Sequence, residues 1–139
     1  EMYAGATGKY PVVGSDLTVA NLSGALVTER EYLKEMPLDP KKNSSFQFSS
    51  KGLSAGNLGY ILIKKNGQED QAFVLASIAE TYDKANATSG MVAGLTKDKE
   101  FGSLTPCKAV KKGDTADADW GKDVCTVTSV NDLRYVVVR

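Results

Sequence analysis

Two apolar runs joined by an Asn-Gly pair place the strongest constraint on how this chain can fold. They lie in residues 59–80, with Asn66 and Gly67 between them. An Asn-Gly pair accepts the positive φ angles of a type I′ turn, so this segment predicts a β-hairpin. Residues 60–63 are apolar on both faces of the predicted strand. We therefore expect one face to pack on a helix and the other to be covered by loops or by a neighbour.

The segment before the hairpin predicts helices and loops. Residues 1–7 have the composition of the end of a helix, which Pro11 prevents from continuing. Residues 8–57 are expected to form a helical and loop connection, with a short strand starting near Phe46. Three leucines in it fall on one face at helical spacing: Leu22, Leu26 and Leu33.

Residues 58–139 complete a single domain. They contain the hairpin, a cysteine-bearing region and a last strand in residues 132–139, which places Leu133, Tyr135 and Val137 on one face. The sequence therefore predicts an α+β fold in which short helices pack on an antiparallel sheet.

The two cysteines, Cys107 and Cys125, flank a polar segment that contains glycine and aspartate. Their spacing is not that of a redox or zinc-binding pair. We expect a disulfide that closes a surface loop, as in exported proteins. Two buried free thiols in a cytosolic domain are the alternative.

Composition narrows the possible functions. The chain has no histidine, the commonest general base and a common metal ligand, so an enzyme is not expected. It has 17 basic and 17 acidic residues, so the net charge does not indicate a nucleic-acid partner. No apolar run reaches the roughly 18 residues that span a bilayer.

Four segments, in this order, resemble the globular part of type IV pilins and of the pseudopilins of type II secretion. They are Gly8-Lys9-Tyr10-Pro11, the Tyr-Leu-x-x-x-Pro-x-Asp-Pro pattern of residues 32–40, the hairpin of residues 59–80, and the cysteine-bounded segment 107–125. The resemblance implies a pilin-like fold, in which the end of a long N-terminal helix and short helices pack on an antiparallel sheet with a disulfide-closed C-terminal loop.

The same resemblance implies a structural subunit of an extracellular or periplasmic fibre. Such subunits associate through an apolar N-terminal helix, which would precede Glu1 and would be the only membrane contact. Assembly machinery of the host would be the other partner. Without that helix, we expect residues 1–139 to be monomeric at micromolar concentration.

A calcium site is a further hypothesis. Asp114, Asp117 and Asp119 lie close together in the sequence, and Ca²⁺ prefers oxygen ligands. Some pseudopilins bind calcium near their C-terminal loops, which favours the site. The spacing is not that of an EF-hand, and a solvated acidic loop is the simpler interpretation.

Three asparagines, Asn21, Asn43 and Asn86, begin Asn-x-Ser/Thr triplets, which are glycan acceptors where the source glycosylates its exported proteins. Trp120, the only tryptophan, is expected to hold its own loop onto the domain, and stacking on a ligand is the alternative. A soluble, exported ligand-binding module that uses the acidic loop or an exposed sheet face is the alternative to the fibre subunit.

Overall fold

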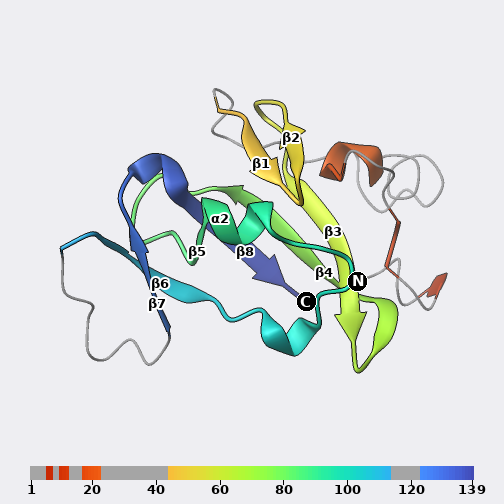
Figure 1. Ribbon diagram of the computed structural model, residues 1–139. Helices are drawn as coiled ribbons and strands as arrows, with labels where there is room; N and C mark the ends of the chain where they lie inside the picture. The colour runs from red at the N-terminus through yellow and green to blue at the C-terminus, as the bar shows by residue number, and fades with distance from the viewer. Residues whose placement is uncertain (1–5, 8–9, 13–16, 23–43, 114–122) are drawn as a thin grey trace.

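The computed structural model describes residues 6–7, 10–12, 17–22, 44–113 and 123–139 (Figure 1). Strands make up most of their regular structure: β1 (Phe46–Phe48), β2 (Lys51–Leu53), β3 (Gly59–Lys65), β4 (Gln68–Ile78), β5 (Ala87–Thr88), β6 (Cys107–Lys111), β7 (Asp123–Val127) and β8 (Leu133–Val138). The helical elements are short: η1 (Val19–Leu22), α2 (Ser89–Ala93), η3 (Phe101–Ser103) and η5 (Val130–Asp132). Among the described residues, no helix is long and apolar enough to cross a membrane.

The main sheet has four antiparallel strands in the order β3-β4-β8-β5. The predicted hairpin is its first half, and the predicted C-terminal strand lies beside β4 as β8. Lys65 pairs with Gln68, and Asn66 and Gly67 between them have φ angles of 53° and 76°. The predicted type I′ turn is therefore confirmed.

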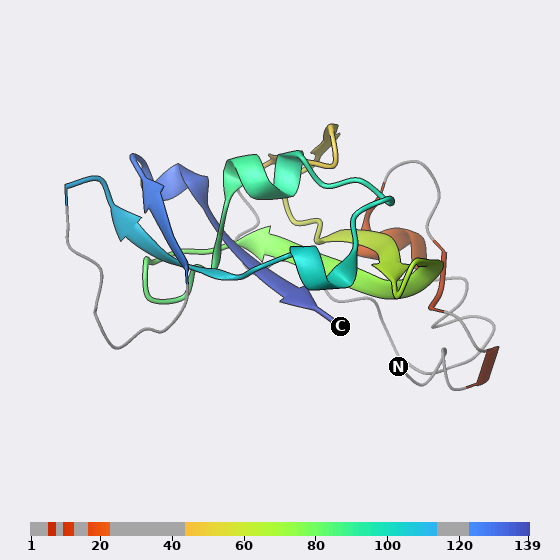
Figure 2. The same ribbon diagram turned by 60° about the horizontal axis from the view of Figure 1, so that its bottom comes forward.

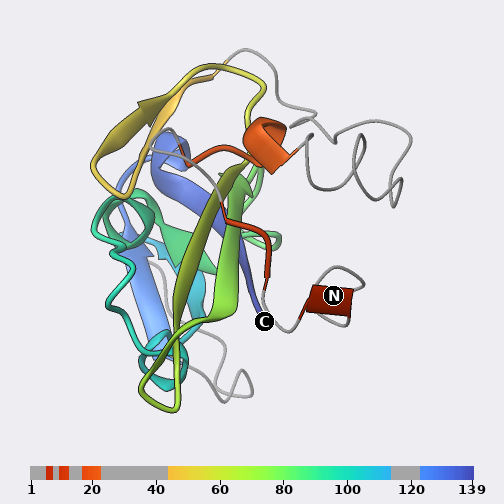
Figure 3. The same ribbon diagram turned by 90° about the vertical axis from the view of Figure 1, so that its right-hand side faces the viewer.

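One face of the main sheet is covered by α2 and by the β1–β2 hairpin, as the edge-on view shows (Figure 3). The buried β3 and β4 residues of this sealed face are Ile61, Ile63, Ala72, Val74, Ala76 and Ile78, and the partly buried Val136 and Val138 of β8 pack against them. Phe48 of β1 is fully buried against them. A Cβ atom on Gly59 would lie 2.7 Å from its ring, so glycine allows this close approach.

The opposite face is covered over β3 and β4 by residues near the N-terminus. Tyr10 meets the Phe73 ring edge-on at 4.9 Å, and Tyr60 stacks on Phe73 at 5.7 Å between ring centroids. The Tyr60 hydroxyl donates a hydrogen bond to the Pro11 carbonyl at 2.9 Å, and Val19 packs into the same cluster. The cover of the two faces is thus mixed: the β1–β2 hairpin shares one face with α2, and the 3-10 element η1 shares the other with Tyr10 and Pro11.

The predicted α+β, pilin-like fold, with a long N-terminal helix and short helices on the sheet, is wrong. The described chain is mostly strand, and α2 has only five residues. The helix expected through Leu22 is described only as the 3-10 turn η1, and Leu26 and Leu33 lie outside the described residues. Short segments cover the sheet faces where a long helix was expected.

The connection predicted as helix and loop also contains more strand than expected. Phe46 does start a strand, but it belongs to a complete hairpin, β1–β2. Ser49 and Ser50 form its turn with positive φ angles of 49° and 64°. Their N–H groups donate to the carbonyls of Val92 and Ala93, at 2.9 and 3.0 Å, and so fix the hairpin on the end of α2.

The cysteine-bearing region forms a separate two-stranded ribbon, β6–β7, at the opposite end of the molecule from the β3–β4 turn (Figures 1 and 2). These two strands are parallel, with Ala109 opposite Cys125, whereas the sequence analysis expected only a disulfide-closed surface loop here. A parallel pair cannot be joined by a tight turn, and β6 ends at Lys111 whereas β7 begins only at Asp123.

Candidate functional site

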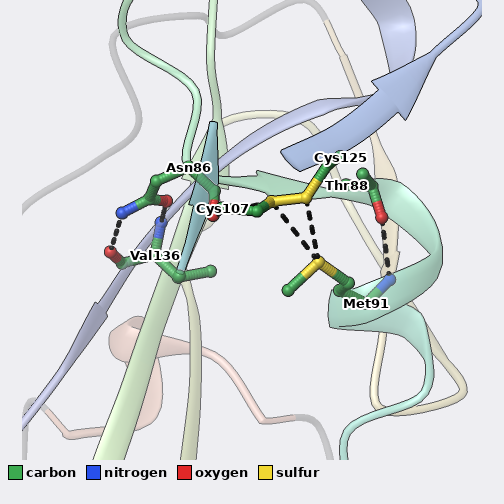
Figure 4. Close-up of a disulfide and its surroundings, with 6 residues drawn as sticks. All are labelled: Asn86, Thr88, Met91, Cys107, Cys125 and Val136. Atoms are coloured by element: carbon green, nitrogen blue, oxygen red, sulfur yellow. Dashed lines mark hydrogen bonds between the residues drawn. A yellow bond between two sulfur atoms is a disulfide. The ribbon is translucent and has the colours of Figure 1, made fainter. Parts of the chain in front are cut away.

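The predicted disulfide between Cys107 and Cys125 is confirmed. It joins the two strands of the β6–β7 ribbon, with Cα atoms 5.6 Å apart. The Sδ atom of Met91 lies 3.9 Å from one sulfur and 3.8 Å from the other (Figure 4). A disulfide sulfur carries no hydrogen to donate, so these are packing contacts. They hold the ribbon against α2, which covers the sealed face.

The predicted calcium ligands Asp114, Asp117 and Asp119 lie outside the described residues, as does Trp120. Asp123 opens β7, opposite Cys107 in the register. Within the described part of the chain, no three histidine, cysteine, aspartate or glutamate residues are grouped so that they could hold a metal ion. The calcium site therefore stays a prediction.

Asn86 extends the short strand β5 with its side chain (Figure 4). Its Nδ2 donates to the Val136 carbonyl at 2.9 Å, and the Val136 N–H donates to its Oδ1 at 2.7 Å. The half-buried side-chain amide of Asn86 thus makes the two hydrogen bonds to β8 that the backbone of one more β5 residue would make. This pairing disfavours a glycan on Asn86 in the folded domain. Asn21 lies in η1, and Asn43 lies outside the described residues.

A buried cation that the sequence analysis missed lies at the start of β8. Arg134 is only 6% exposed, and its Nη1 donates to the carbonyls of Asn131 and Leu133 at 2.6 and 2.9 Å. Its guanidinium lies 5.3 Å from the centroid of the Phe46 ring. Burial lowers the pKa of Arg134, and Asp132 partly opposes that shift. These contacts tie β8 to β1, so we assign Arg134 a structural role.

The surface that best fits a functional role lies over β4 and β8, on the face opposite α2. In the register, Leu75 is opposite Val137, and Ser77 is opposite Tyr135. We call these four residues the open face. Tyr135 is 46% exposed, and the other three are half-buried.

The sequence had placed Leu133, Tyr135 and Val137 on one face of the last strand. The pairing with β4 agrees, because alternate residues of a strand point to the same side. Leu133 is buried at one end of the row. The alternation in the sequence therefore identified which β8 residues share this face. It did not show which of them other segments bury.

The open face can bury apolar area against another protein surface and can donate or accept hydrogen bonds through two hydroxyl groups. Tyrosine is enriched at protein interfaces because it combines a large apolar ring with a polar tip. Comparisons of this chain with models of protein families, with curated proteins and with solved structures found no match.

Proposed function

We propose that this domain is a structural subunit of an extracellular or periplasmic fibre, and that its role is packing and not catalysis. The observation that carries the proposal is the open face, where Tyr135 is 46% exposed beside Leu75 and Val137 on an antiparallel sheet. A subunit that repeats along a fibre needs such preformed surfaces.

The disulfide supports an exported location for this subunit. Disulfides persist in oxidising compartments and are rare in the cytosol. The Cys107–Cys125 bond is also tied to the domain through Met91, so it is part of the folded structure. The order of the four sequence segments that resemble fibre subunits supports the same class of function.

A contact through the open face should be weak in the isolated chain. Four side chains make a small interface, and interfaces of low area have modest affinity. We therefore expect residues 1–139 to be monomeric at micromolar concentration and to self-associate with a Kd of about 0.1–1 mM.

Sedimentation equilibrium over a concentration series tests this proposal. Tyr135→Lys should remove the association, because a lysine at this position places a charge in the apolar contact. Val124→Lys is the matched control, since Val124 is equally exposed at 46% but lies on β7 of the separate ribbon. The proposal is overturned if the chain stays monomeric at millimolar concentration, or if the Tyr135→Lys variant associates as the parent does.

A further inference from the structure

Three sulfur atoms from three separate elements meet beside the disulfide (Figure 4). Met91 of α2 places its Sδ 3.9 Å from the Sγ of Cys107 and 3.8 Å from the Sγ of Cys125. Cys107 begins β6, and Cys125 lies in β7. This sulfur cluster contains every sulfur atom of the described residues.

The backbone holds these side chains in place independently of the disulfide. The Cys107 N–H donates to the Asn86 carbonyl at 2.9 Å, which ties β6 to the start of β5. Cys125 is held by the pairing of β7 with β6. Thr88 caps α2 by accepting a 3.3 Å hydrogen bond from the Met91 N–H. We therefore expect the three sulfur atoms to stay close together when the S–S bond is reduced.

Reduction turns the sulfur cluster into three separate ligands. A thiol reductant supplies two electrons and two protons, the S–S bond breaks, and the reductant itself becomes a disulfide. The product contains two thiols, on Cys107 and Cys125, and the thioether of Met91. All three are soft donors for metal ions.

The distances in the cluster suit a trigonal metal site. Metal–thiolate bonds are about 2.3 Å long, so three sulfur ligands around one ion lie about 4 Å from one another. The Met91 Sδ already has this separation from both cysteine sulfurs. Only the two cysteine sulfurs have to move apart. A cavity of about 20 Å³, lined in part by Met91, Ala87 and Pro106, gives the Met91 side chain room to adjust.

The donor set favours Cu(I) over zinc. Thiolate and thioether sulfurs select soft ions such as Cu(I), whereas protein zinc sites are almost always four-coordinate and use Cys, His, Asp or Glu. The chain has no histidine, and among the described residues no aspartate or glutamate forms a metal-binding group with the two cysteines. Cys107 is 2% exposed, but Cys125 and Met91 are half-buried, so an ion can reach the sulfurs from their side.

We propose that Met91 and the reduced Cys107 and Cys125 form a Cu(I) site, which the disulfide closes in the oxidised protein. Cu(I) displaces the two thiol protons, which pass to solvent, and the ion keeps its oxidation state. Two thiolates and one thioether are then its ligands. This binding activity goes beyond the proposed packing function, and none of the three ligands belongs to the open face.

Copper uptake by residues 1–139 tests the site directly. The protein is reduced with dithiothreitol, desalted without oxygen and mixed with the Cu(I) complex of bicinchoninate, whose colour fades as the protein removes the ion. We expect one Cu(I) for each reduced chain and no uptake by the oxidised chain. X-ray absorption of the loaded protein should find three sulfur neighbours at about 2.3 Å.

Met91→Leu tests the third ligand, because leucine keeps the apolar packing and removes the sulfur. It should lower the Cu(I) affinity of the reduced chain by about tenfold or more, since even substitutions beyond the ligands cost that much at metal sites. Met36→Leu removes another of the three methionines, and as the control it should leave the affinity unchanged.

Thermal unfolding provides a second measurement, because the two thiols of an unfolded chain can also bind Cu(I). A site built by the fold binds the folded state more tightly, so Cu(I) should raise the melting temperature of the reduced chain. The rise should be smaller in Met91→Leu than in Met36→Leu.

Four results would overturn the inference. They are two sulfur neighbours instead of three, equal affinities for the parent and Met91→Leu, a melting temperature that Cu(I) does not raise, and a reduced chain that stays unfolded with Cu(I). Failure here would leave the self-association of the open face intact, and loss of self-association would leave the copper site intact. The two proposals are therefore tested separately.

Discussion

The two faces of the main sheet are built from alternate residues of the same strands, yet different segments of the chain pack on them. The sealed face presents small and branched aliphatic side chains, such as Ile63 and Val74, to α2 and the β1–β2 hairpin. The opposite face presents larger rings, Tyr60 and Phe73, to the N-terminal segment, and it leaves Tyr135 partly exposed.

This difference in packing assigns the two faces different roles, one in the stability of the fold and the other in contacts with a partner. Tight aliphatic packing fills the sealed face, where each lost methyl group leaves a cavity. Tyrosines occupy the other face, where a hydroxyl can reach a backbone carbonyl, as Tyr60 reaches Pro11, or reach solvent, as Tyr135 can. We infer that the sealed face holds the fold together and the open face is free to contact a partner.

The largest expected effect is a stability loss confined to the sealed face. Phe48→Ala should lower the free energy of unfolding by about 3–5 kcal/mol, because it removes a fully buried ring and leaves a cavity. Tyr135→Ala should change it by only about 0.5 kcal/mol, as is usual for surface substitutions. Urea unfolding of both variants measures the two values. Equal losses would contradict the division between the faces.

Removing the disulfide tests how strongly the β6–β7 ribbon holds α2 on the sealed face. It spans 18 residues of sequence, so replacing both cysteines by alanine should lower the free energy of unfolding by roughly 3 kcal/mol. Met91→Leu keeps an apolar side chain on α2 against the ribbon, and it should cost less than about 1.5 kcal/mol. Titration of denatured, unreduced protein should find no reactive thiol. Two reactive thiols would rule out the bond.

The β3–β4 turn serves both faces, because its strands contribute to each. Gly67→Val should lower the free energy of unfolding by about 1–2 kcal/mol, because a β-branched residue resists the φ of 76°. Gly102→Val is the control, since its φ lies outside the left-handed region and a Cβ there meets no atom within 4 Å. Thermal unfolding compares the two. A melting temperature that falls equally for both would count against this turn geometry.

Alkaline pH probes the covered half of the second face. Burial, with smaller contributions from Tyr10 and Asp70, raises the pKa of Tyr60 above its ordinary value. The folded state therefore holds the proton more tightly than the unfolded state does. The stability from neutral Tyr60 is complete below about pH 10 and is lost as pH rises above it.

Tyr60→Phe should remove this part of the alkaline loss. At neutral pH it should cost about 1 kcal/mol, since the Pro11 carbonyl loses its donor. Melting temperatures from pH 8 to 11 measure both effects, and Tyr135→Phe, on an exposed side chain, is the control. An unchanged alkaline slope in Tyr60→Phe would show that another group controls it.

Two turns show what the sequence could predict and why it failed elsewhere. Asn66-Gly67 is a local signal for positive φ, and the predicted hairpin formed around it. The Glu100 carboxylate also accepts hydrogen bonds from both turn N–H groups, at 2.6 and 3.3 Å. Ser49-Ser50 carries no such signal, and its two positive φ angles depend on hydrogen bonds to α2.

The elements missed by the sequence analysis depend on contacts between distant segments. α2 is only five residues long and contains Gly90, so it shows no helical periodicity, although Thr88 caps it through a 3.3 Å bond to the Met91 N–H. The parallel pairing of β6 with β7 cannot be read from alternation alone. The long helix was expected from family resemblance and not from a periodic pattern in the described residues.

The candidate surfaces were predictable to different degrees. Alternation in the last strand correctly placed Tyr135 and Val137 together, so the row that forms the open face was visible in the sequence. The cover of the outer β3 edge was not, because it depends on the backbone hydrogen bonds from Tyr60 to Leu17 and from Lys64 to Lys99. No local pattern encodes that meeting of three segments.

The central claim is that the open face contacts a partner while the sealed face does not. Amide NMR spectra of residues 1–139, recorded from micromolar to millimolar concentration, test it most directly. We expect concentration-dependent shifts at Leu75, Tyr135 and Val137, and none at Val92 of α2 on the sealed side. Shifts centred on α2 or on the β6–β7 ribbon, or spectra that do not change with concentration, would contradict the account.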